Sequence, residues 1–209
     1  PDKIPLDIGS HDCSGIAMMC YRAVRELLGL PAGSPRFRSI ITQTAEVEDD
    51  FADKIKVDVR SVTCGEMQGK YNSEPITRES GYDRLKDVYG VEWKMPVAGG
   101  HYFDMTGHPL ENMGETRDLL DYCWPDMGES ALYRDMRKSA YNITHEQKRA
   151  YCLERPYGGI WETALWMCGF EEMYCRMMLK KKFSHKLMEI ITEMRMQYWK
   201  NALGQVEDQ

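Results

Sequence analysis

Polar side chains lie in or just after three short apolar segments of the chain, where they could bind or act on a ligand. His11 and Asp12 follow the first segment, and Asp58 and Arg60 lie near the end of the second. Every second residue of a strand shares a face, so Asp58 and Arg60 would point the same way. A carboxylate beside an arginine can orient a substrate or move a proton, but such a pair is just as often a structural ion pair.

The third segment leads into residues 154–170, which read ERPYGGIWETALWMCGF. Gly158 and Gly159 suit a tight turn between a strand and a helix, because glycine tolerates positive φ. In α/β folds the loops after the carboxyl ends of strands carry the chemistry. We therefore predict these substrate-binding residues in the three segments: His11, Asp12, Arg60, Tyr157, Trp161, Glu162 and Trp166. The alternative for the two tryptophans is that they only fill the core.

His11 and Cys13 have the spacing of two zinc ligands, but a closed zinc site needs four. The chain has no second tightly spaced pair of ligands, and Cys64 is not obviously close to the first. An ordinary loop before a helix is therefore the favoured interpretation, and no metal ligand is predicted. The sequence contains no P-loop, nucleophile elbow or GxGxxG motif.

The periodicity of apolar residues predicts the elements that position these side chains. We expect core strands at residues 3–8, 55–62 and 150–153, and a hairpin from 91–96 and 101–105 turned at 98–100. Helices are predicted at residues 15–28, 44–54, 116–122, 130–142, 144–149, 160–167, 171–179 and 183–203. Residues 66–81 are rich in turn formers and are predicted to be a loop.

The composition is that of a globular protein, and we predict a single domain over residues 1–209. Hydrophobic residues make up 43% of the chain and charged residues 29%, with a net charge of -6. The negative charge argues against a nucleic-acid partner, and no apolar run approaches the roughly 20 residues that span a bilayer. Seven cysteines without a CxxC pair favour free thiols in a reducing cytoplasm. The chain begins at Pro1 without a methionine, so its natural start is expected to lie upstream.

Several segments, taken in order, resemble the uroporphyrinogen decarboxylase superfamily, and more narrowly its branch of cobalamin-linked methyltransferase-like proteins. The resemblance covers nearly the whole chain. The segments that carry it are PLDIGS at 5–10, SGIAMMCYRAVRELLGL at 14–30, FADKIKVDVRSV at 51–62, YGVEWKMP at 89–96, YFDMTGHPL at 102–110 and GGIWETALWMCGFEE at 158–172.

The resemblance implies an α/β fold of the (β/α)8 TIM-barrel family. Its site would lie at the mouth of the barrel, at the carboxyl ends of the strands. Such a barrel needs about 250 residues, so the chain would supply an N-terminal partial barrel with a β-hairpin insertion. The aspartate that ends the second strand in the decarboxylases is similar in placement to Asp58, which is therefore the predicted catalytic residue. Their paired arginines after the first strand are absent from residues 10–14, and Trp166 lies near the place of their tyrosine. These departures disfavour decarboxylation of a highly anionic porphyrinogen.

In the methyltransferase branch, a zinc ion held by a His-x-Cys pair and a distant cysteine activates a thiol for attack on methylcobalamin. Those ligands would lie in a C-terminal half outside this chain, and the His11–Cys13 pair follows the wrong strand for that role. The resemblance thus implies no cofactor bound directly by this segment. It implies a corrinoid held by a partner protein and a zinc ion in the C-terminal half.

The expected function is transfer of a methyl group to or from a small-molecule acceptor, with a corrinoid protein as partner. One alternative is a uroporphyrinogen decarboxylase-type lyase, and another is a non-catalytic fragment or partner-binding pseudoenzyme. The sequence is also compatible with a homodimer.

Overall fold

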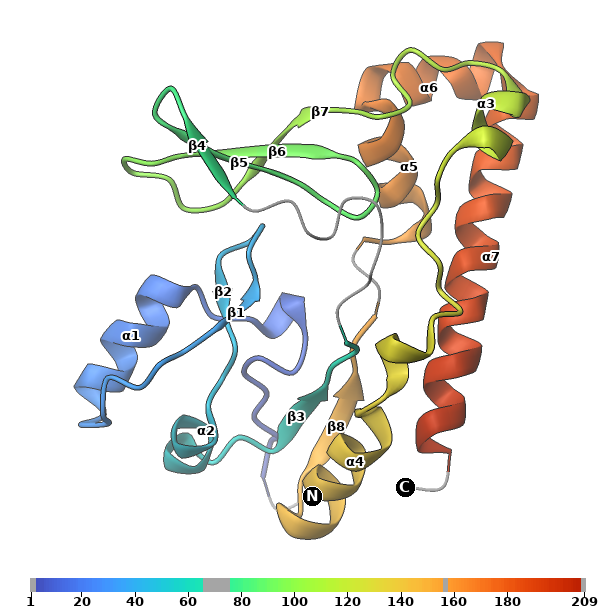
Figure 1. The fold of residues 1–209 in the computed structure, drawn as a ribbon. Coiled ribbons are helices and arrows are strands. Elements are labelled where there is room, and N and C mark those ends of the chain that lie inside the picture. Colours follow the sequence, from blue (N-terminus) through green and yellow to red (C-terminus); the bar gives the residue numbers. More distant parts are fainter. Residues whose placement is uncertain (1–2, 66–75, 156–157, 208–209) are drawn as a thin grey trace.

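The computed structural model describes residues 3–65, 76–155 and 158–207, which form a mixed α/β structure (Figure 1). Its strands form three sheets, none of which closes into a barrel in the described residues. The strands are β1 (Phe37–Ser39), β2 (Thr44–Ala45), β3 (Val59–Val62), β4 (Thr77–Glu79), β5 (Tyr82–Lys86), β6 (Glu92–Pro96), β7 (Asp104–Gly107) and β8 (Ala150–Leu153). The helices are α1 (Met18–Leu27), α2 (Asp49–Ile55), α3 (Thr116–Asp121), α4 (Met136–Tyr141), α5 (Ile160–Cys168), α6 (Phe170–Leu179) and α7 (Lys181–Val206).

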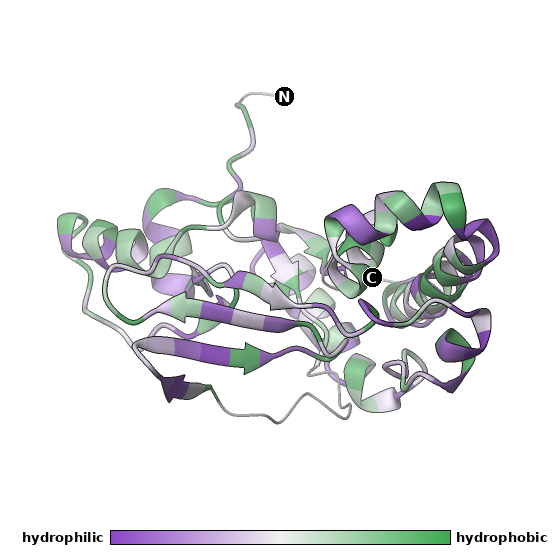
Figure 2. Ribbon diagram, turned by 90° about the horizontal axis from the view of Figure 1, so that it is seen from above, coloured by the Kyte–Doolittle hydropathy of each residue, from purple (hydrophilic) through white to green (hydrophobic). Residues whose placement is uncertain are grey.

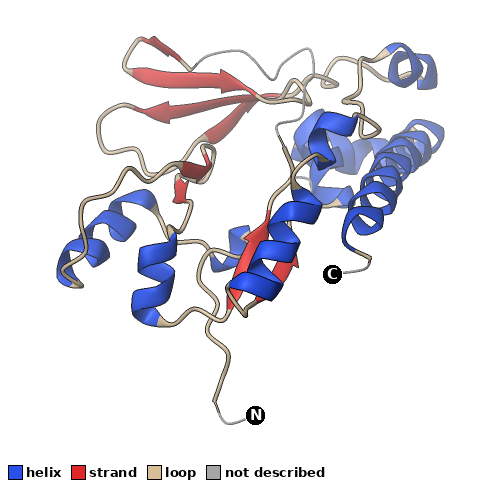
Figure 3. Ribbon diagram, turned by 60° about the horizontal axis from the view of Figure 1, so that its bottom comes forward, coloured by secondary structure: helices blue, strands red, loops and turns tan. Residues whose placement is uncertain are grey.

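Three segments far apart in the sequence run side by side in the same direction. β3 and β8 pair in parallel, from Val59 opposite Ala150 to Val62 opposite Leu153. Residue Asp7 forms a parallel bridge to Val59 on the other side. The predicted adjacency of the three core segments can therefore be seen in the structure, and α4 lies across the β3–β8 pair (Figure 3).

The bounds predicted for two of these segments, and for the helix between them, are wrong. Residues 3–8 form a single bridge rather than a strand. Residues 44–54 were expected to be a helix, but α2 begins only at Asp49 and continues to Ile55. Lys56 then takes a left-handed conformation with φ 59°, which ends the helix, so that β3 begins at Val59 instead of residue 55.

The four-stranded sheet, in the order β4-β5-β6-β7, is antiparallel and has one apolar face. Leu85, Met95 and Met105 on that face pack against the main core, and the ring of Trp93 lies edge-on to Trp166 at 5.6 Å. Hydrophilic and hydrophobic residues both occur along its strands (Figure 2). The predicted hairpin is confirmed as β6 and β7. Strand β4 lies within a segment predicted to be a loop, and residues 66–75 of that segment lie outside the described residues.

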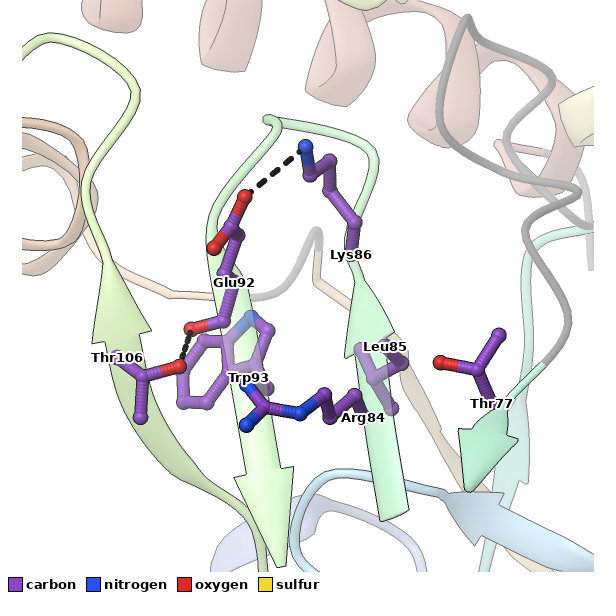
Figure 4. Close-up of a pocket in the computed structure, with 7 residues that line it drawn as sticks. All are labelled: Thr77, Arg84, Leu85, Lys86, Glu92, Trp93 and Thr106. Carbon is purple, nitrogen blue, oxygen red and sulfur yellow. Dashed lines mark hydrogen bonds and ion pairs between the residues drawn. The ribbon is translucent and has the colours of Figure 1, made fainter. Parts of the chain in front are cut away.

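The opposite face of this sheet carries polar side chains. An open pocket of about 430 Å³ at the sheet is lined by Thr77, Arg84, Lys86, Glu92 and Thr106 together with Leu85 and Trp93 (Figure 4). Lys86 Nζ lies 3.1 Å from Glu92 Oε1, and the Thr106 hydroxyl donates to the Glu92 carbonyl at 3.4 Å. Such cross-strand charge pairs stabilise a solvated sheet face. These contacts account for the charged side chains of the lining as partners across the strands.

The buried apolar residues form two separate hydrophobic cores. The larger one joins the four-stranded sheet to α4, α5, α6 and α7, whereas the smaller one surrounds Tyr21, Phe51 and Val57 between α1 and α2. The predicted helix at 130–142 is split into a 3-10 turn, η2 (Ser130–Tyr133), and α4, which continues into a π-helical turn, η3 (Asn142–Glu146). None of the described helices has both the length and the apolar character needed to cross a membrane.

Candidate functional site

The carboxyl ends of the three parallel segments meet at one edge, where polar side chains follow each of them. Cys64 comes shortly after β3, and Glu154 comes directly after β8. The segment after Asp7 leads to Asp12, which begins a short 3-10 turn, η1 (Asp12–Ser14). Ligands of open α/β sheets bind at this edge, so these side chains define the candidate site.

Arg38 of β1 lies at the centre of the site and joins two of the three segments. Its Nη2 lies 3.1 Å from Glu154 Oε1, and its Nε lies 3.4 Å from Asp12 Oδ1. The guanidinium also donates to the carbonyls of Gly9 at 3.1 Å and Ser10 at 3.4 Å. The Arg38 side chain is only 3% exposed, so its charge is neutralised inside the protein by the two carboxylates. We call Asp12, Arg38 and Glu154 the Arg38 cluster.

Glu154 is the acidic group of the site with a shifted pKa. Burial raises the pKa of its carboxyl above the ordinary value, Arg38 acts in the opposite direction, and the nearby charge of Asp12 raises it again. Cys64 Sγ approaches Glu154 Oε2 at 3.9 Å, and burial raises the pKa of that thiol to about 11. The Tyr198 hydroxyl of α7 donates to the Glu154 carbonyl, which fixes the end of β8 against the main core. A buried carboxyl with a raised pKa holds a proton more readily than an ordinary one, which makes Glu154 the candidate proton acceptor of the edge.

His11 and Arg155 form the outer part of the same edge. Arg155 Nε donates to His11 Nε2 at 3.0 Å, while the Cys13 amide donates to His11 Nδ1 at 3.2 Å. A neutral imidazole has only one nitrogen that accepts a hydrogen bond, so the two contacts cannot both be hydrogen bonds at the same time. Arg155 is therefore held less firmly than Arg38 and is the arginine better able to turn toward a ligand.

The structure does not bring Asp58 to this edge, so the sequence-based assignment of Asp58 to the end of a strand is wrong. Asp58 comes before β3 and lies at the opposite, amino end. Its Oδ1 lies 2.6 Å from Lys3 Nζ, and its Oδ2 accepts from the Leu6 amide at 2.8 Å. The hydrogen bond from Lys3 is the main reason that the pKa of Asp58 is lowered. These contacts tie the N-terminal segment to the sheet.

The other predicted residues have mostly structural contacts. Arg60 Nη2 lies 2.6 Å from Asp49 Oδ1, which is an ion pair rather than a pairing with Asp58. Glu162 Oε2 accepts from the Gly159 amide at 3.1 Å and caps the start of α5. Trp161 packs edge-on against Tyr174, and Trp166 is 6% exposed, as expected of a residue that fills the core. Tyr157 lies outside the described residues.

The groups that sequence reasoning missed are Arg38, Cys64, Glu154 and Arg155. Residues 35–41 carry no periodicity, so nothing in the sequence indicated that Arg38 would lie between two segments that are distant along the chain. Glu154 and Arg155 directly follow a predicted strand, and that position was the available signal.

The residues at this edge do not fit a zinc ion. Both ring nitrogens of His11 face N–H donors, so neither is directed at a metal together with Cys13. Across the part of the chain that the structure describes, no three His, Cys, Asp or Glu side chains gather as a metal-binding group.

Comparison of the sequence with protein-family models, with curated proteins and with solved structures gives no match. The function of the chain therefore has to be inferred from its residues and their geometry.

Proposed function

We propose that the chain is part of an enzyme of the uroporphyrinogen decarboxylase superfamily, in the branch linked to cobalamin, that transfers a methyl group to or from a small-molecule acceptor. The resemblance of six ordered segments motivates this assignment. On this proposal the three parallel segments are the first strands of a barrel, and the sheet β4–β7 is an insertion between the second and third.

The observation that carries the proposal is that Asp12, Arg38 and Glu154 meet at the carboxyl edge of those segments. The segments are neighbours in chain order, as strands of a barrel are, and they are followed by Asp12, Cys64 and Glu154. Arg38 holds the first and third loops together through contacts of 3.4 and 3.1 Å. Groups held by such contacts lose little entropy when a substrate binds, so the edge would be preorganised for a ligand.

The residues of this chain would bind the acceptor and move its proton. A corrinoid carried by a partner protein would supply the methyl group. The acceptor gains that methyl group and loses a proton, and we assign the proton to Glu154, because burial raises the pKa of its carboxyl. Arg38 would keep the Glu154 carboxylate oriented after the proton has left, while Arg155 would turn from His11 toward an anionic acceptor.

Methyl transfer can be tested directly with the purified full-length protein, methylcobalamin and a panel of small thiols. We expect loss of the methylcobalamin absorbance that depends on both protein and thiol, with one methylated thiol formed for each methyl group lost. Absence of transfer for every acceptor would overturn the proposal.

A decarboxylase-type lyase is the second candidate, and Arg155 is the observation that favours it. Residues 10–14 contain no arginine, but Arg155 lies 3.0 Å from His11, so the edge does present a cation near that loop. Release of carbon dioxide from uroporphyrinogen, without methyl transfer, would favour the lyase. Absence of both reactions would favour the third alternative, a non-catalytic fragment or partner-binding pseudoenzyme.

A further inference from the structure

Helix α6 presents an exposed apolar face. Phe170, Tyr174, Met177 and Met178 recur at the spacing of one side of a helix, and each side chain is at least 44% exposed. The opposite side of α6 packs into the larger core through Met173, which is fully buried. The four exposed residues, which we call the α6 face, therefore lie on the solvent side of a helix that is already anchored.

A neighbouring helix extends the α6 face. Trp161 of α5 is partly exposed, and its ring lies edge-on to that of Tyr174 at 5.6 Å. Contiguous exposed apolar patches mark places where a protein meets a partner or a membrane. Aromatic residues and methionine are also enriched in the centres of protein interfaces. The composition of the α6 face is therefore that of a contact surface.

The charges at the two ends of α6 indicate which partner fits this surface. Glu171 is exposed in the first turn of α6, and Lys181 and Lys182 are exposed at the start of α7, which follows directly (Figure 1). In the described residues none of these three has an ion-pair partner, whereas Glu172 pairs with Arg176 at 2.7 Å. Lysines in the first turn of a helix lie at its positive end, so a carboxylate from outside would stabilise them.

A second copy of the chain satisfies both ends at once when two α6 helices pack antiparallel about a twofold axis. The two apolar faces then cover each other, and the acidic start of each helix lies near the lysines that follow the other. A parallel pairing would bring like charges together, which is unfavourable. An anionic membrane would attract Lys181 and Lys182 but would repel Glu171. The distribution of charge therefore favours a second copy.

We infer that the protein forms a homodimer through the α6 face, with antiparallel α6 helices and Glu171 of each copy near Lys181 and Lys182 of the other. The ten residues of α6 span only about 15 Å. The contact is therefore smaller than the roughly 800 Å² per partner of a standard stable interface, and we expect a dimer that exchanges with the monomer. No residue of the α6 face belongs to the Arg38 cluster, so the inference does not depend on methyl transfer.

Sedimentation velocity of the protein over a wide range of concentrations tests the contact. We expect monomer at low concentration and dimer at high concentration, with a micromolar dissociation constant. Met178→Glu places a charge in the apolar face and should weaken dimerisation by about tenfold or more. Met196→Glu, at another exposed position 66% accessible on α7, is the matched control and should leave the dissociation constant unchanged.

Charge reversal distinguishes a second copy from a membrane. Glu171→Lys alone, or Lys181→Glu together with Lys182→Glu, brings like charges together and should weaken the dimer several-fold. Combining all three substitutions restores opposite charges, so most of the affinity should return. Binding to anionic phospholipid vesicles would instead increase with Glu171→Lys and would not recover in the combined variant. All three positions are exposed, so the variants are expected to fold.

Cys175 provides an independent measurement of the arrangement. It is exposed near the middle of α6, so the twofold axis would bring the two copies of this thiol close together. A short bismaleimide should link the wild type into a covalent dimer. The link should also form in Cys20→Ser, which removes an exposed thiol of α1, but not in Cys175→Ser.

The inference is overturned if the protein stays monomeric at every concentration or if Met178→Glu dimerises like the wild type. It is also overturned if the combined charge variant dimerises no better than its parents, or if the protein binds anionic vesicles without dimerising. Loss of methyl transfer with an intact dimer would instead count against the proposed function alone.

Discussion

Arg38 Nη2 lies 3.1 Å from Glu154 Oε1, although the two residues are 116 positions apart in the sequence. This ion pair joins the β1–β2 hairpin to the carboxyl end of β8. The carboxylates of Asp12 and Glu154 are about a fifth exposed, so they are partly removed from water and depend on the guanidinium for their charge balance.

Replacing Arg38 should destabilise the protein much more than replacing an exposed arginine. Arg38→Ala leaves two partly buried carboxylates without a cation, and we expect a loss of about 2 to 4 kcal/mol in the free energy of unfolding. Arg117 is 88% exposed and pairs with Asp121 along α3. Arg117→Ala should therefore change the stability by less than about 0.5 kcal/mol. Chemical denaturation of both variants checks this, and equal losses would count against a structural role of the Arg38 cluster.

The raised pKa of Glu154 predicts a specific pH dependence of stability. The folded state holds the Glu154 proton more tightly than the unfolded state does, chiefly because the carboxyl is buried. This contribution to stability is complete below the ordinary pKa of 4.5 and is lost as the pH rises through the raised value. Relative to Glu154→Gln, the wild type should lose stability across that interval. Urea unfolding of both proteins between pH 4 and 7 measures the difference, and parallel curves would contradict the assignment.

Much of the architecture could be predicted from apolar periodicity, but the site could not. The periodicity of residues 150–153 and 160–167 predicted β8 and α5 well, because local pattern and burial agree there. Asp58 was misplaced because a left-handed turn at Lys56 delays the start of β3 to Val59. Asp58 therefore precedes the strand, at its amino end, whereas ligands of α/β sheets bind at the carboxyl end. Arg38 could not have been found, since its role depends on contacts with residues distant along the chain, such as Glu154, 116 positions away.

The free cysteines should fall into groups of different reactivity. Cys13, Cys20, Cys123 and Cys175 are exposed, whereas burial raises the pKa of Cys64 and of Cys168 to about 11. The thiolate is the reactive form, and a pKa of about 11 in place of the ordinary 9.0 leaves about 100-fold less thiolate at neutral pH. We therefore expect Cys64 and Cys168 to be alkylated about 100-fold more slowly than a thiol with the ordinary pKa. Timed labelling with peptide mass spectrometry identifies each thiol. Rapid labelling of Cys64 in the folded protein would show that the interior of the site is open to solvent.

Gly158 should be the glycine least tolerant of substitution in the turn before α5. Its φ is +76°, and a Cβ added there would lie 2.8 Å from the Trp166 ring. Gly158→Ala is expected to cost about 2 kcal/mol, since strain at positive φ adds to the contact. Gly204 in α7 has no atom within 4 Å of an added Cβ, so Gly204→Ala should stabilise the protein by about 1 kcal/mol. Thermal unfolding of the two variants compares them, and shifts of the same sign would contradict this account of the turn.

The central claim, that the Arg38 cluster carries out the chemistry, is tested most directly by the rate of methyl transfer from methylcobalamin to a small thiol in Glu154→Gln. Glutamine keeps the shape of the side chain but cannot take the acceptor's proton, so we predict a rate about 100-fold below that of the wild type. Glu171→Gln, at an exposed position of α6, is the matched control and should remain within about twofold of the wild type. A Glu154→Gln enzyme as fast as the wild type and the control would contradict the claim.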